Sequence, residues 1–282
     1  MRRAAFWAGL LLGSLLLAGC GGESGTPQDT SGTSGGVSLP VDSGGTQTAV
    51  SHLSTTAPYG HYLYLPGGYR ADGPEYPLLV FLHGAGEKGD SSTNPATLDK
   101  VLVHGPPRLI REGHWAPSLP MIVASPQCHD GGWNATKLHD FITYLLATYR
   151  IDPSRIYMTG LSMGGYGTFA YCTAKGADAY VAAVVPICGG GSTGQAGNMA
   201  QIPTWAFHGD ADSTVSVTNS INMIAAINTA HPTIPARLTI YPGVGHDSWT
   251  RTYNGSGMGT ERADYDPFTE DVFEWMLRYQ RL

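Results

Sequence analysis

Short apolar stretches alternate with longer segments of helical periodicity along most of the chain. Runs that fit buried strands lie at residues 77–82, 121–124, 155–159, 180–187, 203–207 and 237–241, and residues 61–65 alternate as a partly exposed antiparallel strand would. Helical spacing of apolar residues covers residues 138–149, 166–174, 217–230 and 271–279. Strands that alternate with helices in this way predict a single domain of the α/β class, with a mainly parallel central sheet flanked by helices.

The first twenty residues follow a different pattern. Arg2 and Arg3 precede an almost purely apolar run over residues 6–18, which closes at Leu17-Ala18-Gly19-Cys20. A basic start, a short apolar run and small residues at its end are typical of a secretory signal, and the run is too short to span a bilayer. The ending resembles a bacterial lipobox and predicts removal of residues 1–19 and lipidation of Cys20. An ordinary signal peptide with an incidental cysteine is the alternative.

Residues 20–48 are rich in Gly, Ser and Thr, so we expect a flexible tether between the anchor and a folded domain at 49–282. The lipid would hold this domain at the exported side of the cell envelope. Loss of Arg2 and Arg3 leaves 14 basic residues (16 − 2) against 22 acidic ones, a formal charge of −8. With no Lys/Arg-rich stretch, nothing indicates a nucleic-acid partner. We expect a monomer that contacts a membrane only through its anchor.

Three cysteines follow Cys20, namely Cys128, Cys172 and Cys188. Their odd number and the absence of a C-x-x-C pair argue against a disulfide framework or a zinc site. All three stand in apolar or strand-end contexts that are typical of buried thiols, although one disulfide remains compatible with the pattern. We therefore expect no metal and no other cofactor.

The motif G-x-S-x-G occurs around Ser34, Ser162 and Ser192, and only context separates a reactive serine from a chance match. A nucleophile elbow needs a strand directly before the serine and a helix directly after it, because that sharp turn lifts the hydroxyl clear of the sheet. Ser34 lies in the predicted tether, and Ser192 runs into a glycine-rich loop. Only Ser162 stands between a predicted strand and a helix-compatible segment. We predict that it is the nucleophile, a plain tight turn being the alternative.

A serine hydroxyl becomes a good nucleophile only when a base takes its proton and an acid orients that base. With an elbow of this kind the chain order is serine, acid, histidine. The segment His208-Gly-Asp-Ala-Asp212 follows the strand at 203–207 and offers two acids, Asp210 and Asp212. His246 follows the last strand in a glycine-rich turn, so we predict that it is the base. His208 is interpreted as a structural residue at a strand end.

Two backbone N–H groups must face the negative charge that develops on the substrate oxygen. By position, one belongs to Met163, directly after the nucleophile. The other belongs to Ala85 in the loop His83-Gly-Ala-Gly86, which follows the strand at 77–82. We expect His83 to orient this loop.

The surroundings of the site are indicated by one short segment and two tryptophans. Only residues 189–201 separate the strand at 180–187 from the strand at 203–207. That segment is too short for the helical lid that many lipases insert here, so we expect an open cleft. Trp133 and Trp249 are candidates for contacts with substrate, and core packing is the alternative for each.

Five segments in a fixed order resemble the bacterial esterase/predicted-peptidase group of α/β-hydrolases, close to polyhydroxybutyrate-depolymerase-like and feruloyl-esterase-like enzymes. They are Phe81-Leu-His-Gly-Ala-Gly-Glu-Lys-Gly89, Ser125-Pro-Gln-Cys128, Thr159-Gly-Leu-Ser-Met-Gly-Gly-Tyr-Gly-Thr168, Pro186-Ile-Cys-Gly-Gly190 and Gly245-His-Asp-Ser-Trp249. The resemblance covers residues 57–282. It implies the α/β-hydrolase fold and a triad of Ser162, Asp212 and His246, in which the acid is the second aspartate of H-G-x-x-D. The segment 253–267 is longer than is usual in the group.

The resemblance implies a serine carboxylic-ester hydrolase that acts through an acyl-enzyme. The signal segment predicts that it is exported, and the open cleft predicts action on short-chain, aryl or polymeric esters. A serine peptidase of the same fold is the alternative, although such peptidases usually carry an additional gating domain. A non-catalytic protein that retains the fold is a third interpretation, against which the complete triad argues. The residues do not indicate which acyl or alcohol group is preferred.

Overall fold

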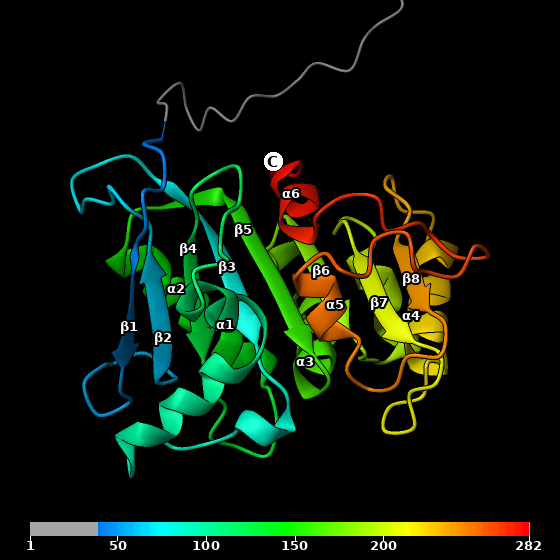
Figure 1. Ribbon diagram of the computed structural model, residues 1–282, viewed down its shortest axis with the longest axis horizontal. Coiled ribbons are helices and arrows are strands. Elements are labelled where there is room, and N and C mark those ends of the chain that lie inside the picture. The colour runs from blue at the N-terminus through cyan, green and yellow to red at the C-terminus, as the bar shows by residue number, and fades with distance from the viewer. Residues whose placement is uncertain (1–38, 282) are drawn as a thin grey trace, which may run out of the picture. The chain divides into compact units, whose positions relative to one another are not determined.

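The computed structural model describes residues 39–281 of the chain (Figure 1). The predicted signal segment 1–19, the predicted lipidation site Cys20 and residues 21–38 of the predicted tether lie outside the described residues. Within residues 39–281, no helix has the length and apolar character that crossing a bilayer requires.

Eight strands form one sheet in the order β1-β2-β4-β3-β5-β6-β7-β8. The strands are β1 (Thr46–Val50), β2 (His61–Leu65), β3 (Tyr76–Leu82), β4 (Ile122–Pro126), β5 (Ile151–Leu161), β6 (Ala183–Ile187), β7 (Trp205–Gly209) and β8 (Arg237–Tyr241). The pairs β1–β2 and β2–β4 are antiparallel, and all the other neighbours are parallel. The predicted α/β-hydrolase fold, with a mainly parallel sheet, is confirmed.

Helices cover both faces of the sheet, so its central strands are apolar throughout. In β3, Leu78 and Val80 point to one face and Leu79 and Phe81 to the other, because successive side chains of a strand alternate. On the first face lie α2 (Ala135–Thr148), α3 (Met163–Lys175) and α4 (Thr218–Thr229); on the second lie α1 (Gly105–Arg111), α5 (Trp249–Tyr253) and α6 (Val272–Leu277) (Figure 1). Two hydrophobic cores result, one on each side of the sheet.

Several elements were not indicated by hydrophobic periodicity. Strand β1 is mostly exposed, pairs with β2 alone and begins inside the range that we expected to be tether. Leu39 is also buried, so the folded part begins earlier than residue 49. Most side chains of β1 face solvent, so this strand carries no apolar pattern. The 3₁₀ helix η2 (Pro95–Val103) and the short helices α1 and α5 were likewise not predicted.

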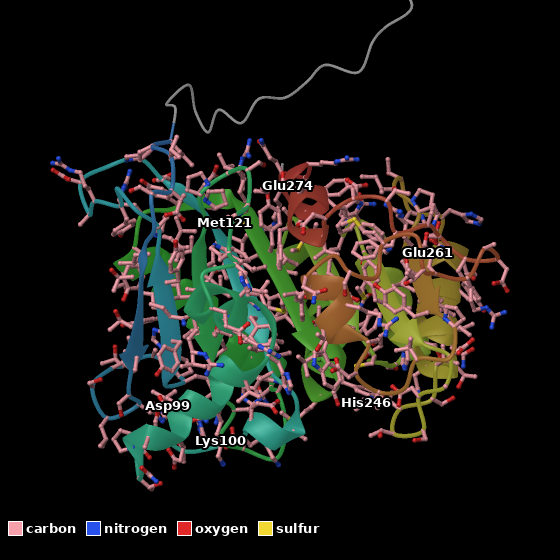
Figure 2. The ribbon with its side chains drawn as sticks, viewed as in Figure 1. Asp99, Lys100, Met121, His246, Glu261 and Glu274 are labelled. Atoms are coloured by element: carbon pink, nitrogen blue, oxygen red, sulfur yellow. The ribbon has the colours of Figure 1, made fainter. Side chains whose placement is uncertain are left out.

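The carboxyl ends of the parallel strands meet at one edge of the sheet, where the loops after β3, β5, β7 and β8 come together. Figure 2 shows His246 at this edge, with Met121 and Glu274 toward the opposite one. Residues 188–204, all of which are described, contain only the 3₁₀ helix η4 (Thr193–Met199), so the predicted absence of a large lid is confirmed here. Part of the segment 253–267 lines β8, because the N–H groups of Arg262 and Asp266 donate to Ile240 and Leu238.

Candidate active site

Ser162 occupies a sharp turn between β5 and α3. Its backbone has φ 54° and ψ −117°, a conformation that costs free energy for any residue with a side chain. The Ser162 N–H donates to the carbonyl of Ile187 in β6 at 3.0 Å, which holds the turn. The flanking glycines leave no room for a side chain: a Cβ on Gly164 would lie 1.9 Å from the carbonyl oxygen of Leu82. This is the elbow geometry that the strand–serine–helix context predicted.

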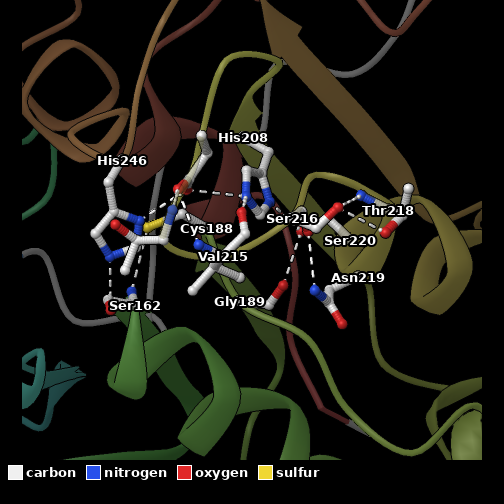
Figure 3. Close-up of polar contacts among 12 residues, drawn as sticks. Ser162, Cys188, Gly189, His208, Val215, Ser216, Thr218, Asn219, Ser220 and His246 are labelled. Carbon is white, nitrogen blue, oxygen red and sulfur yellow. Dashed lines mark hydrogen bonds and ion pairs between the residues drawn. The ribbon is translucent and has the colours of Figure 1, made fainter.

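The three residues predicted as a triad form a chain of hydrogen bonds through His246, and Figure 3 shows His246 pointing toward Ser162. His246 Nδ1 lies 2.7 Å from Asp212 Oδ2, and His246 Nε2 lies 2.9 Å from Ser162 Oγ. A carboxylate can only accept, so Nδ1 carries the proton and Nε2 accepts from the serine hydroxyl. The Asp212 side chain is fully buried, whereas 22% of the His246 side chain is exposed. In this arrangement the imidazole can remove the hydroxyl proton while the buried carboxylate fixes its orientation.

Asp212 is a well-stabilised buried carboxylate. Its Oδ1 accepts from the N–H groups of Thr214 and Val215, both at 2.9 Å. Burial by itself would raise the pKa of Asp212, but the hydrogen bonds from His246, Val215 and Thr214 outweigh it, so this pKa lies below its usual value. The carboxylate is therefore charged at neutral pH, as an acid that orients an imidazole must be.

Asp210, the other aspartate of the loop, lies apart from the serine and has different partners. Its Oδ1 accepts from the N–H of Gly243 at 2.7 Å, and its Oδ2 lies 3.3 Å from Arg262 Nη1. These contacts tie the loop after β7 to the turn after β8. Asp210 thus has a structural place, and Asp212 is the aspartate that reaches His246.

The two residues predicted to supply oxyanion donors each begin a helical segment. Met163 is the first residue of α3, and Ala85 is the first residue of the 3₁₀ helix η1 (Ala85–Glu87). First-turn N–H groups have no intrahelical acceptor and are available to an external one. The two loops are close, because a Cβ on Gly84 would lie 3.6 Å from Ser162 Cβ. Ala85 is exposed and Met163 is half-buried, so both are open to solvent.

The loop that contains Ala85 is held by buried side chains. His83 Nδ1 lies 2.6 Å from the carbonyl oxygen of Gly84, and His83 Nε2 accepts from the N–H of Cys128 at 2.9 Å. Burial lowers the pKa of His83 to about 4, so the ring is neutral at physiological pH. Trp133 Nε1–H donates to the carbonyl of His83 at 3.1 Å. These contacts agree with the expectation that His83 orients the loop.

The two tryptophans proposed for the cleft pack against the site. Trp133 is half-buried and lies edge-on to the His83 ring, with a centroid distance of 4.9 Å. Trp249 is 9% exposed and meets the His246 ring edge-on at 5.2 Å. Each ring supports a residue of the site, and a substrate contact for either one stays a prediction. Tyr166, one helical turn after Ser162, was not singled out by the sequence, yet its side chain is exposed.

Cys188 is a neighbour of the site that the motifs did not indicate. Its Sγ lies 3.3 Å from the N–H of Ser162, and its backbone φ is 40°. Ligand atoms of Cys188, Asp212 and His246 lie within 4.8 Å of one another, a spacing compatible with a metal among the described residues. Burial raises the pKa of the Cys188 thiol to about 12, and the other two side chains bind each other, so this set is poorly suited to a cation. Like Cys128 and Cys172, Cys188 is buried, as predicted, and all three thiols are free, so the one disulfide that the sequence left open is not formed.

The chain is similar to known hydrolases in sequence and in structure. The profile of the dienelactone hydrolase family matches residues 132–280. No curated protein matches the chain by sequence. A solved thermostable esterase is 27% identical with a TM-score of 0.61, over 86% of this chain and 64% of that esterase, so the chain spans less than two thirds of its length. The feruloyl esterase module from Clostridium thermocellum, solved in complex with sinapinate, is 18% identical with a TM-score of 0.52, over 78% of this chain and 87% of that module.

Proposed function

The chain belongs to the dienelactone hydrolase family, and from this premise we propose that it is a serine carboxylic-ester hydrolase that acts through an acyl-enzyme. One observation carries the proposal: Ser162 Oγ, His246 and Asp212 form a continuous hydrogen-bonded chain with distances of 2.9 and 2.7 Å. The similarity to a thermostable esterase at 27% identity supports the same reaction class.

The proposed reaction begins at the serine. Ser162 Oγ attacks the carbonyl carbon of the ester while its proton passes to His246 Nε2, and the carbonyl oxygen becomes an oxyanion. The N–H groups of Met163 and Ala85 stabilise that oxyanion, since negative charge is favoured at a helix N-terminus. Collapse of the intermediate breaks the bond to the alcohol, which leaves with the proton from His246. The acyl group stays on Ser162.

Water completes the cycle by the same route. His246 takes a proton from a water molecule, whose oxygen attacks the acyl carbon. The second oxyanion uses the same two N–H groups, and its collapse releases the carboxylic acid and returns the proton to Ser162. Throughout, Asp212 keeps Nε2 of His246 facing the serine and stabilises the imidazolium.

Exposure of the site favours short-chain, aryl or polymeric esters. Ser162 and Met163 are half-buried, Ala85 is exposed, and residues 188–204 hold no helical insertion that would cover them. An open site needs no lipid interface to uncover it, so we propose activity on dissolved esters without interfacial activation. The exposed ring of Tyr166 offers an aromatic surface beside the nucleophile. Such a contact contributes about 1 kcal/mol.

The proposal is tested by replacing the nucleophile. Residues 39–282, purified, should hydrolyse p-nitrophenyl acetate and butyrate, with rates that fall toward palmitate and show no jump at the solubility limit. Ser162→Ala should lose activity by several orders of magnitude, because triad members act as a unit. Ser192→Ala, in a second G-x-S-x-G string, is the matched control and should retain full activity. Turnover by a folded Ser162→Ala protein would contradict the proposal, and cleavage of peptide anilides faster than of esters would favour the peptidase alternative.

A further inference from the structure

His208 and His246 both lie within 3.2 Å of Oδ2 of Asp212, and Figure 3 shows the two rings near each other. Its Nε2 is 3.2 Å from Asp212 Oδ2 and 2.9 Å from the carbonyl oxygen of Val215. Both side chains of the pair are fully buried. The sequence indicated only a structural residue at a strand end, because a histidine four residues before an aspartate has no fixed geometry in a loop.

The carboxylate of Asp212 is surrounded by polar groups. An ionised carboxylate has about four acceptor positions, and buried ones are costly when empty. Oδ1 accepts from the N–H groups of Thr214 and Val215, and Oδ2 faces His246 Nδ1 and His208 Nε2. The side chain is closed to water, and the N–H of His208, whose hydrogen bond goes to the carbonyl of Val215, is the fourth polar group that faces the carboxylate.

The contacts of His208 determine which ring nitrogen carries the proton. Nε2 faces two oxygens that can only accept, those of Val215 and Asp212, so it must be a donor. Burial is the main influence on His208 and lowers its pKa, so the ring is neutral and Nδ1 is an acceptor. The hydroxyl of Ser220, 2.8 Å from Nδ1, supplies the proton for that bond. Ser220 Oγ also lies 3.2 Å from the carbonyl oxygen of Gly189. The hydroxyl has a single proton, and with a neutral His208 ring we assign that proton to the bond with Nδ1.

We propose that His208 is a positioning residue for the catalytic carboxylate: its Nε2–H holds Oδ2 of Asp212 in line with His246 and shares the negative charge. The inference rests on the proposed function, because it assigns His208 a part in that same triad. A histidine that served packing alone would contribute to stability and leave the ionisation of the site unchanged.

The consequence for activity follows from charge sharing. Without the N–H of His208, more negative charge stays on Oδ2 of Asp212, and the imidazolium of His246 is held more strongly. The acidic limb of the profile of kcat/KM against pH then moves to higher pH. The other titratable groups near the pair are Cys188 and Tyr166, whose pKa values are raised chiefly by burial so that both stay neutral, and Asp247, whose carboxylate accepts from Thr250.

Two amide replacements separate positioning from packing. The amide nitrogen of glutamine reaches the place of a histidine Nε2, whereas that of asparagine reaches the place of Nδ1. His208→Asn therefore loses the donor to Asp212, and His208→Gln restores it. We expect His208→Asn to lower kcat/KM by about tenfold and to shift the acidic limb upward by up to about one pH unit, the scale of one hydrogen bond to a charged group. His208→Gln should return both toward wild type.

Stability and activity are measured together so that each failure is distinct. His61→Asn replaces another fully buried histidine, in β2, whose Nδ1 contacts only the carbonyl of Tyr59; it should lower the melting temperature and leave the pH profile unmoved. Equal acidic limbs in wild type, His208→Asn and His208→Gln, with wild type active and Ser162→Ala inactive, would overturn the inference and leave the proposed function standing. Loss of the proposed function itself would show as an inactive wild type or an active Ser162→Ala protein.

Discussion

The loops after β3 and β7 begin alike and complete the site in different ways. At the end of β3, His83-Gly84 leads to Ala85, which offers a backbone N–H; at the end of β7, His208-Gly209 leads to Asp212, which offers a carboxylate. Both histidines are fully buried, and burial lowers the pKa of each. In both loops a neutral imidazole precedes the group that the proposed reaction uses, the N–H of Ala85 in one and the carboxylate of Asp212 in the other.

The two rings carry their protons on opposite nitrogens. His83 donates from Nδ1 to the carbonyl of its neighbour Gly84 and accepts at Nε2 from Cys128, so it binds backbone alone. His208 donates from Nε2 to the carbonyl of Val215, faces the side chain of Asp212 with the same nitrogen at 3.2 Å, and accepts at Nδ1. The first histidine shapes a loop, and the second supports a charge. The same dipeptide at the end of a buried strand therefore does not imply the same task.

The largest effect that tests this contrast belongs to the loop after β7, where the proposed role depends on one side chain, that of Asp212. Asp212→Asn should lower kcat by about ten-thousand-fold, because an amide fails to hold the tautomer of His246 that accepts from Ser162. Asp210→Asn keeps an oxygen for Gly243 and should cost less than about tenfold, the scale of an exposed ion pair. Rates for both variants on p-nitrophenyl butyrate, with circular dichroism to check folding, decide the matter. The reverse ranking would move the acid to Asp210.

A smaller effect is expected in the loop after β3, where the function lies in the backbone. His83→Phe removes the bonds to Gly84 and Cys128 but leaves the N–H of Ala85 in the chain. A misplaced oxyanion donor should lower kcat by about 10- to 100-fold. This reduction is no larger than the one expected when an oxyanion-hole donor is removed altogether. The reduction should be the same at every pH, because His83 makes no contact with the triad carboxylate. A shift of the acidic limb in this variant would erase the contrast with His208.

The smallest effect concerns stability in acid. The folded-state pKa of His83 is about 4, below the unfolded value of about 6.5, so between these values only the unfolded chain binds the proton. The contribution of His83 to the free energy of unfolding is complete above pH 6.5 and is lost as the pH falls toward 4, by about 1.4 kcal/mol per pH unit. Urea unfolding at several pH values gives the free energy of unfolding as a function of pH. Between pH 4 and 6.5 this free energy should change less with pH in His83→Phe than in wild type.

His61 offers a parallel measurement outside the site. Burial also lowers its pKa to about 4, so His61→Phe should likewise reduce the change of the free energy of unfolding with pH. Its activity at neutral pH should equal that of wild type. If the free energy of unfolding changed with pH in both variants as it does in wild type, burial would not be what keeps these rings neutral.

Local sequence determined much of the fold because burial leaves a local record. Strands covered on both faces, such as β3 and β6, read as continuous apolar runs, and helices α2 and α4 show their period. The elbow at Ser162 was readable as well, since a serine between a strand and a helix, with glycines on both sides, allows few other conformations. The exposed edge strand β1 buries almost nothing and left no such record.

Contacts between residues far apart in the chain are harder to predict from local sequence. A hydrogen bond forms only when the fold brings a donor and an acceptor together in the right orientation. The order of strands in the sheet brings Ser162, Asp212 and His246 together, as motif order predicted, and their catalytic roles stay a proposal. Only the tertiary structure decided that Trp133 and Trp249 pack against His83 and His246, and that Asp212 has a second histidine behind it. Apolar periodicity records which face of an element is covered, whereas the position of a proton on a buried ring depends on the acceptors that other strands deliver to it.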